Sequence, residues 1–579
     1  MAIISNTAES VQRTNKKINI KIIMHTRFYI TAIALAIGLF TANAQDKKAG
    51  KTGEAEHRFE IAKNLDIFNS IYKQLELFYV DTLDAQKVIR VGIDAMLDEL
   101  DPYTVYYPEE EMSDLKMMTT GKYGGIGSII RQRKDKTVMI AEPYENMPAA
   151  EVGLKVGDIL KQIDDTDLTG KNTSEVSDML RGEPGTTFVL KIQRPGEDKM
   201  REFKVTRRNI KLPAIPYSGM IDSLGYINLS SFTENCSSEV RKAVINLKNQ
   251  GAKAIVLDLR GNGGGLLQEA VDIVNLFVPK GHEIVSTKGK IKAANSIYKT
   301  SSEPLDTDIP LAILVNSGTA SAAEIVSGSL QDLDRGVVVG TRTYGKGLVQ
   351  TPRPLPYNGS LKLTSSKYYI PSGRCIQAID YKNRREAHSD GRIPDSLTTV
   401  FHTAGGREVR DGGGITPDIE VKHDTLPNLL FYLSNDDVLV DYATRYVQTH
   451  DAPSSVAQFK LTDADYEEFK KMTIDSGFTY DRLSGKRLEE LRKVADFEGY
   501  LDDAKEEFAA LEKKLEHNLS KELDHFRIDI EKIVSQEIIK RYFYQRGIIE
   551  EQLKDDEDLK AAQKILNSPD EYKSILGKK

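Results

Sequence analysis

The chain has 579 residues, enough for about three to five domains of ordinary size. Hydrophobic residues make up 40% and charged residues 28%, a balance typical of globular proteins with an ample core. A formal net charge of −7 excludes a global basic field of the kind that recruits nucleic acid. The two cysteines, Cys236 and Cys375, exclude a disulfide framework and a multi-cysteine metal site, and leave open whether they pair.

The N-terminal segment has the pattern of an export signal. Basic residues precede an apolar run at 28–40, which is as long as a signal-peptide core and shorter than the roughly 20 residues of a membrane span. The small-x-small pattern at 42–44 follows, so we expect residues 1–44 to be cleaved after Ala44, with Met24 as an alternative start. An uncleaved anchor is the alternative. The mature protein is then expected to be exported to the periplasm and soluble there, with a membrane-proximal location left open.

Four regions with different hydrophobic patterns follow the signal. Apolar residues at helical spacing in 45–118 predict an N-terminal helical region. Residues 119–209 contain short β-like runs divided by Gly, Pro and Asp turns, which predicts a small β domain. In 210–424 strands alternate with helices. Residues 425–579 are almost entirely helical with interleaved acids and bases, which favours a solvated bundle or extension; an arm for homo-oligomers or an adaptor is the alternative.

Within the region 210–424, three runs are apolar on both faces, at 254–259, 311–315 and 336–340. Such strands are typical of a sheet that is covered on both sides. The region is therefore expected to be an α/β layer structure.

A turn rich in small residues, at 316–325, follows one of these buried strands and opens a helix. A serine there has its hydroxyl at the positive end of a helix, beside free amide groups, which suits a nucleophile whose attack generates an oxyanion. The alternative is a capping serine, because Ser and Thr commonly begin helices.

Two further turns contain several glycines. The turn 260–265 is similar to a dinucleotide-binding fingerprint, but Leu266 stands where a glycine is needed; its glycines could instead expose an amide for an oxyanion hole, or simply form a tight turn. The turn 340–347 differs from a phosphate-binding loop because Gly347 replaces the Ser or Thr that would hold magnesium, and the prolines that follow forbid a helix. Lys346 thus lies among glycines after an apolar strand, which favours a constrained amine over a solvated one.

The serine turn and the lysine turn together suggest a catalytic pair. No histidine lies near Ser321, and a neutral lysine can serve as the base of a serine nucleophile. Burial must then lower the pKa of Lys346 from about 10.4 toward roughly 7–8. No Asp or Glu occurs in 341–367, which agrees with this requirement.

These segments resemble the carboxyl-terminal processing (tail-specific) serine peptidases. The family's G-T-A-S-A-S-E turn matches GTASAAEI at 318–325, with Ala323 in place of the second serine. Its R-x-N-x-G-G turn matches 260–265, and its lysine stretch matches YGKGLVQ at 344–350. Flanking stretches at 100–104, 368–374 and 414–418 are also family-like.

The resemblance implies a role for each matching residue. Ser321 would be the nucleophile, Lys346 the general base, and Gln350 the residue that orients the lysine. The backbone amides of Gly265 and Ala322 would form the oxyanion hole. No metal or organic cofactor is implied.

The β domain fits the same family, which carries a PDZ domain. Residues 148–160 resemble the PDZ signature, and Gly124, Gly125, Ile126 and Gly127 resemble its carboxylate-binding loop. Consecutive amides in such a loop can hold a terminal carboxylate while the peptide adds as a strand to a sheet edge. A spacer without a binding role is the alternative, and Arg181 is predicted to link this domain to the core.

The sequence as a whole predicts an α/β multidomain protein. The resemblance implies a crotonase-like catalytic core with an inserted PDZ domain, preceded by N-terminal helices and followed by a helical C-terminal extension. The expected activity is cleavage of polypeptides recognised by their C-termini, with no nucleic-acid partner. A crotonase-type acyl-CoA enzyme and a non-catalytic PDZ scaffold are the alternatives.

Overall fold

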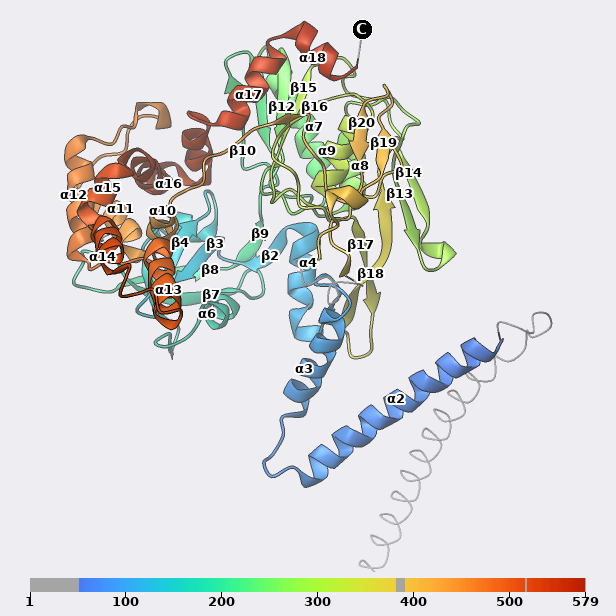
Figure 1. Cartoon of the computed structure of the whole chain (residues 1–579), viewed down its shortest axis with the longest axis horizontal. Helices are drawn as coiled ribbons and strands as arrows, with labels where there is room; N and C mark the ends of the chain where they lie inside the picture. Colours follow the sequence, from blue (N-terminus) through green and yellow to red (C-terminus); the bar gives the residue numbers. More distant parts are fainter. Residues whose placement is uncertain (1–50, 382–390, 516–517, 578–579) are drawn as a thin grey trace, which may run out of the picture. The chain divides into compact units, whose positions relative to one another are not determined.

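The computed structural model describes residues 51–381, 391–515 and 518–577 (Figure 1). The chain divides into two compact units, Met1–Gly92 and Ile93–Lys579. Within the described ranges, no helix is long and apolar enough to cross a membrane. The apolar run at 28–40 and the predicted cleavage site after Ala44 lie outside the described residues.

Helices dominate the N-terminal part of the described chain. Helix α2 (Lys51–Phe78) belongs to the first unit, and α3 (Ala85–Asp98) runs across the division into the second. A short 3-10 turn, η1 (Glu109–Glu111), leads into α4 (Met112–Thr120). Gly121 ends α4 in the left-handed conformation that glycine adopts readily, with φ of 66°.

The β domain is built on one antiparallel sheet in the order β3-β4-β5-β7-β8, with β6 paired to β5. Burial alternates along β7, whose inward-facing Phe188, Leu190 and Ile192 form the centre of its core. The first and last strands of the domain, β2 and β9, pair with each other in a separate two-stranded sheet. The elements are β2 (Lys122–Gly125), β3 (Ser128–Gln132), β4 (Val138–Pro143), α5 (Pro148–Glu151), β5 (Ile159–Ile163), β6 (Thr166–Asp167), α6 (Thr173–Leu180), β7 (Thr187–Gln193), β8 (Arg201–Thr206) and β9 (Arg208–Lys211).

The central sheet of the core has the order β10-β11-β12-β15-β16-β21, and all neighbours except β10 and β11 are parallel. Strands β12 and β15 are buried along their whole length, as their continuous apolar runs predict. The strands are β10 (Tyr217–Ile221), β11 (Leu224–Asn228), β12 (Ala254–Asp258), β15 (Leu311–Val315), β16 (Val337–Gly340) and β21 (Ile419–Glu420).

Two sets of helices cover this sheet. Ile255 and Leu257 pack with α7 (Cys236–Asn249), α8 (Leu267–Asn275) and α9 (Ala322–Asp332). Ala254 and Val256 pack instead with the last two helices of the chain, α17 (Glu557–Leu566) and α18 (Pro569–Ile575). The interpretation of the C-terminal region as a solvated extension is therefore wrong for these two helices, which complete the core of the α/β sheet (Figure 1).

A second, antiparallel sheet has the order β1-β18-β13-β14, with β17 also paired to β18. Strand β17 follows Lys346, as expected for a segment whose prolines forbid a helix. The remaining elements of this part are β1 (Val105–Tyr107), β13 (Glu283–Gly289), η2 (Lys292–Ala294), β14 (Ser296–Lys299), β17 (Leu348–Pro354), β18 (Ser360–Tyr369), η4 (Asp395–Leu397), β19 (Val400–His402) and β20 (Glu408–Arg410).

The other C-terminal helices form a bundle with its own apolar core, which includes Leu433, Phe469 and Ile538. The bundle is joined to the β domain by ion pairs from β3 and the turn after it to α11, such as Arg131–Asp437 at 2.9 Å and Arg133–Asp441 at 2.7 Å. Its elements are α10 (Asn428–Asn435), α11 (Asp437–Thr449), η5 (Val456–Gln458), α12 (Asp463–Asp475), α13 (Leu483–Phe497), α14 (Lys505–Lys514), α15 (Leu519–His525) and α16 (Arg527–Leu553).

Candidate active site

Ser321 stands at the sharp turn between strand β15 and helix α9. Its backbone has φ of 57° and ψ of −117°. A serine that only caps a helix has extended backbone dihedrals, whereas a positive φ in a residue with a side chain costs on the order of 1–3 kcal/mol. A strained strand-to-helix turn that exposes a serine hydroxyl is the arrangement of the nucleophile in α/β-hydrolases. The conformation of Ser321 therefore favours the nucleophile over the capping serine.

The glycine turn 260–265 lies directly against Ser321. A Cβ atom on Gly264 would be 2.8 Å from Ser321 Cβ and 2.9 Å from the nitrogen of Ala322, so only glycine permits this approach. Among the residues that the structure describes, the backbone amides of Gly265 and Ala322 donate to no other protein group. Both amides are thus free to bind an oxyanion beside the serine.

Asn262, for which no role was predicted, joins the glycine turn to the serine turn. Its side chain is fully buried, donates to the carbonyl of Leu229 at 2.7 Å and accepts from the amide of Gly264 at 2.9 Å. Its carbonyl accepts from the amide of Ala320 at 2.9 Å. These bonds fix the two turns relative to each other, and with them the predicted oxyanion amides of Gly265 and Ala322.

The side chain of Lys346 is half-buried in the same part of the molecule. Burial, followed by the charge of nearby Lys362, lowers its pKa from 10.5 to about 8. Two carboxylates, Asp101 and Glu324, oppose this shift. Both acids come from segments outside 341–367, which the fold brings to the lysine, so the absence of acids from its own stretch does not describe its whole surroundings.

The amine of Lys346 lies over an aromatic ring. The Nζ atom of Lys346 lies 4.2 Å from the centre of the ring of Tyr103. The hydroxyl of Tyr103 is itself hydrogen-bonded to those of Tyr344 at 3.1 Å and Tyr381 at 3.0 Å. Tyr103 thus gives the lysine a fixed, largely apolar surface to lie on.

The carboxyl group of Glu324 ties the serine turn to the lysine turn. It is fully buried, and its Oε2 atom accepts from the amides of Ser321 at 2.8 Å and Lys346 at 2.9 Å. Its Oε1 atom accepts from the amide of Gly345 at 2.7 Å and the hydroxyl of Thr343 at 2.5 Å. Burial raises the pKa of this carboxyl, and the four hydrogen bonds oppose that rise. Sequence reasoning missed the residue, although a Glu three positions after a helix-opening Ser is the signature of a capping box.

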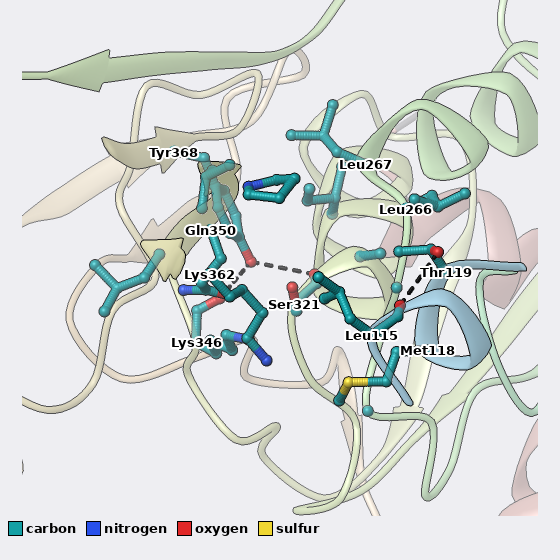
Figure 2. Close-up of a pocket in the computed structure, with 18 of the residues that line it drawn as sticks. Leu115, Met118, Thr119, Leu266, Leu267, Ser321, Lys346, Gln350, Lys362 and Tyr368 are labelled. Atoms are coloured by element: carbon teal, nitrogen blue, oxygen red, sulfur yellow. Dashed lines mark hydrogen bonds between the residues drawn. The ribbon is translucent and has the colours of Figure 1, made fainter. Parts of the chain in front are cut away.

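Tyr368 on β18 joins the same two turns from the other side. Its hydroxyl lies 2.7 Å from the carbonyl oxygen of Lys346 and 3.1 Å from that of Ser321, as the dashed lines in Figure 2 show. Gln350 lies beside them, but its side-chain nitrogen donates to Thr364 Oγ1 at 3.2 Å. Within the described chain no hydrogen bond joins Gln350 to Lys346, and none joins Ser321 Oγ to Lys346 Nζ. The predicted orienting role of Gln350 is therefore not visible in this arrangement.

All five predicted catalytic positions, Ser321, Lys346, Gln350, Gly265 and Ala322, line one cavity of about 680 Å³ (Figure 2). Its walls are mostly apolar, and helix α4 forms one of them. The larger apolar side chains that line it are Met112, Leu115, Met118, Leu266, Leu267, Ile325, Leu348, Val349 and Pro352. Besides the candidate catalytic residues, the polar side chains of the lining are Lys116, Thr119, Lys362 and Tyr368. A cavity of this size with mostly apolar walls suits the side chains of a polypeptide.

A second groove, of about 140 Å³, lies in the β domain. Gly125 and Ile126 line it, together with Tyr123, the first residue of the segment that resembles a carboxylate-binding loop; Gly124 and Gly127 are outside its lining. Two of the four residues of the predicted binding loop therefore line the groove.

Helix α4 separates the groove from the cavity. Its Met117 lines the groove of the β domain, while its Leu115 and Met118 line the cavity of the core. Arg181 pairs with Asp114 on α4 at 2.5 Å, so the link predicted from Arg181 to the core runs to this helix instead.

Three family models match the chain: "Peptidase family S41" at residues 223–384, "PDZ domain" at 139–194, and "Probable PDZ-protease, C-terminal helical domain" at 429–566. The chain is 38% identical over 321 residues to a carboxy-terminal-processing protease of Bartonella bacilliformis, covering 55% of this chain and 73% of the relative. It is 32% identical over 389 residues to a probable CtpA-like serine protease of Staphylococcus aureus, covering 65% and 75%. Among solved structures, the photosystem II D1 C-terminal processing protease matches with 26% identity and a TM-score of 0.34, covering 62% of this chain and 87% of that one.

Proposed function

The chain belongs to the carboxy-terminal-processing proteases, the serine proteases of peptidase family S41 that carry a PDZ domain, and from this membership we propose that it is an exported endopeptidase with a Ser-Lys catalytic centre. Ser321 is the nucleophile, and Lys346 is its general base. The amides of Gly265 and Ala322 form the oxyanion hole, and Gln350 assists the lysine once substrate is bound. The core that carries them is proposed to be crotonase-like.

The observation that carries this proposal is the convergence of complementary groups in one cavity. A strained serine, an amine with a pKa of about 8 and two free amides all line it. The carboxyl of Glu324 accepts hydrogen bonds from the backbone amides of Ser321 and Lys346, which fixes the two residues relative to each other. This combination supports acyl transfer, because a serine hydroxyl is a weak nucleophile unless a nearby base takes its proton.

The reaction follows from these positions. Ser321 Oγ attacks the peptide carbonyl carbon while neutral Lys346 Nζ takes its proton, and the two amides hold the oxyanion, an effect of roughly 3–4 kcal/mol per donor. The ammonium of Lys346 then protonates the leaving amine, and the C–N bond breaks to leave an ester on Ser321. Water, activated by the neutral lysine, hydrolyses this ester and regenerates the serine.

The β domain supplies substrate recognition in this proposal. A polypeptide C-terminus adds along the groove lined by Gly125 and Ile126, and amides of the loop 124–127 receive its carboxylate. The chain then reaches the cavity, whose apolar walls accept its side chains.

The decisive experiment incubates the purified protein with an unfolded polypeptide and identifies fragments by mass spectrometry. Internal cleavage by the wild type, abolished in both Ser321→Ala and Lys346→Ala with unchanged circular dichroism, is the expected result. Fragments from Lys346→Ala at the wild-type rate would contradict the assignment of the base. Binding of C-terminal peptides without any fragments would instead indicate a scaffold.

A further inference from the structure

The glycine turn that supplies an oxyanion amide is tied to the C-terminal helices by an ion cluster. Arg260, the first residue of the turn, contacts Asp258 at the end of β12 at 2.6 Å. It also contacts Asp556 at 2.6 Å and Asp558 at 2.9 Å, both at the beginning of α17. We propose that Asp556 and Asp558 are positioning residues for the oxyanion turn, so that the last helices of the chain form part of the catalytic apparatus; this inference rests on the proposed function.

The cluster is buried, unlike the many ion pairs on the surface of the bundle. The side chain of Arg260 is 20% exposed, that of Asp556 10% and that of Asp558 4%. Each pair excludes most water, and its geometry is therefore held far more firmly than that of an exposed pair. The guanidinium group contacts both oxygens of Asp556, at 3.0 and 2.6 Å, which fixes its plane as well as its position.

The two acids are themselves rigid. Asp556 caps α17, and its Oδ1 accepts from the amide of Leu559 at 2.9 Å. Leu559 and Ala562 of the same helix pack on the central sheet beside Val256 of β12. The two acids are thus fixed to the central sheet, whose strand β12 leads into the glycine turn. They contact Arg260 from helix α17, a separate element.

Side-chain packing supports little of the turn on this side, although the amide of Gly261 donates to Asn316 Oδ1 at 2.9 Å. Within the described chain, a Cβ atom on Gly261 or on Gly263 would meet nothing within 4 Å, so side-chain packing does not fix these residues. Asn262 anchors the middle of the turn, and Arg260 anchors its start. Misplacing a catalytic hydrogen-bond donor by about 1 Å can lower the rate on the order of a hundredfold, so losing one anchor should be visible in the rate.

The test compares the full-length wild type with the double variant Asp556→Asn/Asp558→Asn. Asp555→Asn is the matched control, because Asp555 lies on the same segment but pairs with Lys560 at 3.5 Å. The measurements are kcat and KM on an unfolded polypeptide, affinity for a peptide aldehyde whose hemiacetal oxygen occupies the oxyanion hole, and affinity for a C-terminal peptide. We expect kcat and aldehyde affinity to fall tenfold or more, with KM and C-terminal peptide affinity unchanged. The control should behave as the wild type.

A folded double variant with wild-type kcat and aldehyde affinity would overturn the inference, as would a lower melting temperature without loss of aldehyde affinity. If the double variant does not fold, Arg260→Lys replaces it, because lysine keeps the charge but cannot contact both acids in the same fork. It should lose aldehyde affinity and kcat by a similar factor, and unchanged values would overturn the inference. A wild type that neither cleaves polypeptide nor binds the aldehyde would refute the proposed function itself.

Discussion

The backbone amide of Lys346 donates a hydrogen bond of 2.9 Å to the buried carboxyl of Glu324. The same oxygen accepts a hydrogen bond from the amide of Ser321. One atom therefore binds the backbones of both candidate catalytic residues, which are more than 20 residues apart in the sequence. The relative position of the proposed nucleophile and the proposed base therefore depends on a side chain that has no proposed part in the chemistry.

Replacing Glu324 with Gln should impair both stability and catalysis. A glutamine amide nitrogen cannot accept hydrogen bonds, so two of the four donors lose their acceptor inside the protein, at about 1–3 kcal/mol each. We expect a fall in kcat of tenfold or more and a lower midpoint of urea unfolding. Glu269→Gln is the control, because Glu269 accepts from the amides of Asn235 and Ser237 away from the lysine. It should lose stability while kcat is retained, and equal loss of kcat in both variants would contradict a specific role for Glu324.

The pH dependence of cleavage should follow the titration of Lys346. Burial disfavours the charged amine, which lowers its pKa to about 8, and only the neutral amine can accept the serine proton. Below pH 8, kcat/KM should therefore rise about tenfold per pH unit, and above it should level off. A profile measured between pH 6 and 10 that is flat, or that falls above neutrality, would argue against a lysine base.

The charge of Lys362 should set the position of this profile. Lys362 lines the same cavity and helps to lower the pKa of Lys346, so Lys362→Gln should move the midpoint to higher pH. Cleavage at pH 7 should fall roughly two- to fivefold, while the plateau at high pH is retained. Lys116→Gln is the matched control, because Lys116 also lines the cavity but is not among the causes of the shift. A midpoint that is the same in all three proteins would refute this explanation.

Binding to the β domain should depend on a free C-terminus. Loop amides can bind a carboxylate, so a peptide with a C-terminal amide should bind about tenfold or more weakly than the free acid. In Gly125→Val, a side chain would clash with the ring of Tyr123, which is 2.7 Å from a Cβ atom there. This variant should lose affinity for the free acid in fluorescence anisotropy, while kcat on a short peptide is unchanged. Equal binding of acid and amide would contradict carboxylate recognition.

The parts of the site that the sequence predicted are those that depend on local pattern. Glycines beside an apolar strand placed Lys346 in a constrained turn, and small residues between a strand and a helix placed Ser321 at a helix start. The continuous apolar strands likewise predicted a sheet that is covered on both faces. In each case the neighbours in sequence determine the local structure.

What the sequence did not predict depends on contacts between distant segments. Asp101 and Tyr103 reach Lys346 only because the chain folds back over more than 200 residues. The sequence of helix α17 has the pattern of an amphipathic helix on the protein surface. Neighbouring residues in the sequence do not indicate that its apolar face covers the central sheet. The two cysteines, whose pairing was left open, are both free thiols.

The positive φ of Ser321 has a consequence for the stability of variants at this position. Glycine adopts a φ of 57° without strain, so Ser321→Gly should raise the melting temperature where Ser321→Ala does not, by relieving on the order of 1–3 kcal/mol. At this one position, reactivity and thermal resilience oppose each other, and the most heat-resistant form of the protein would be an inert one.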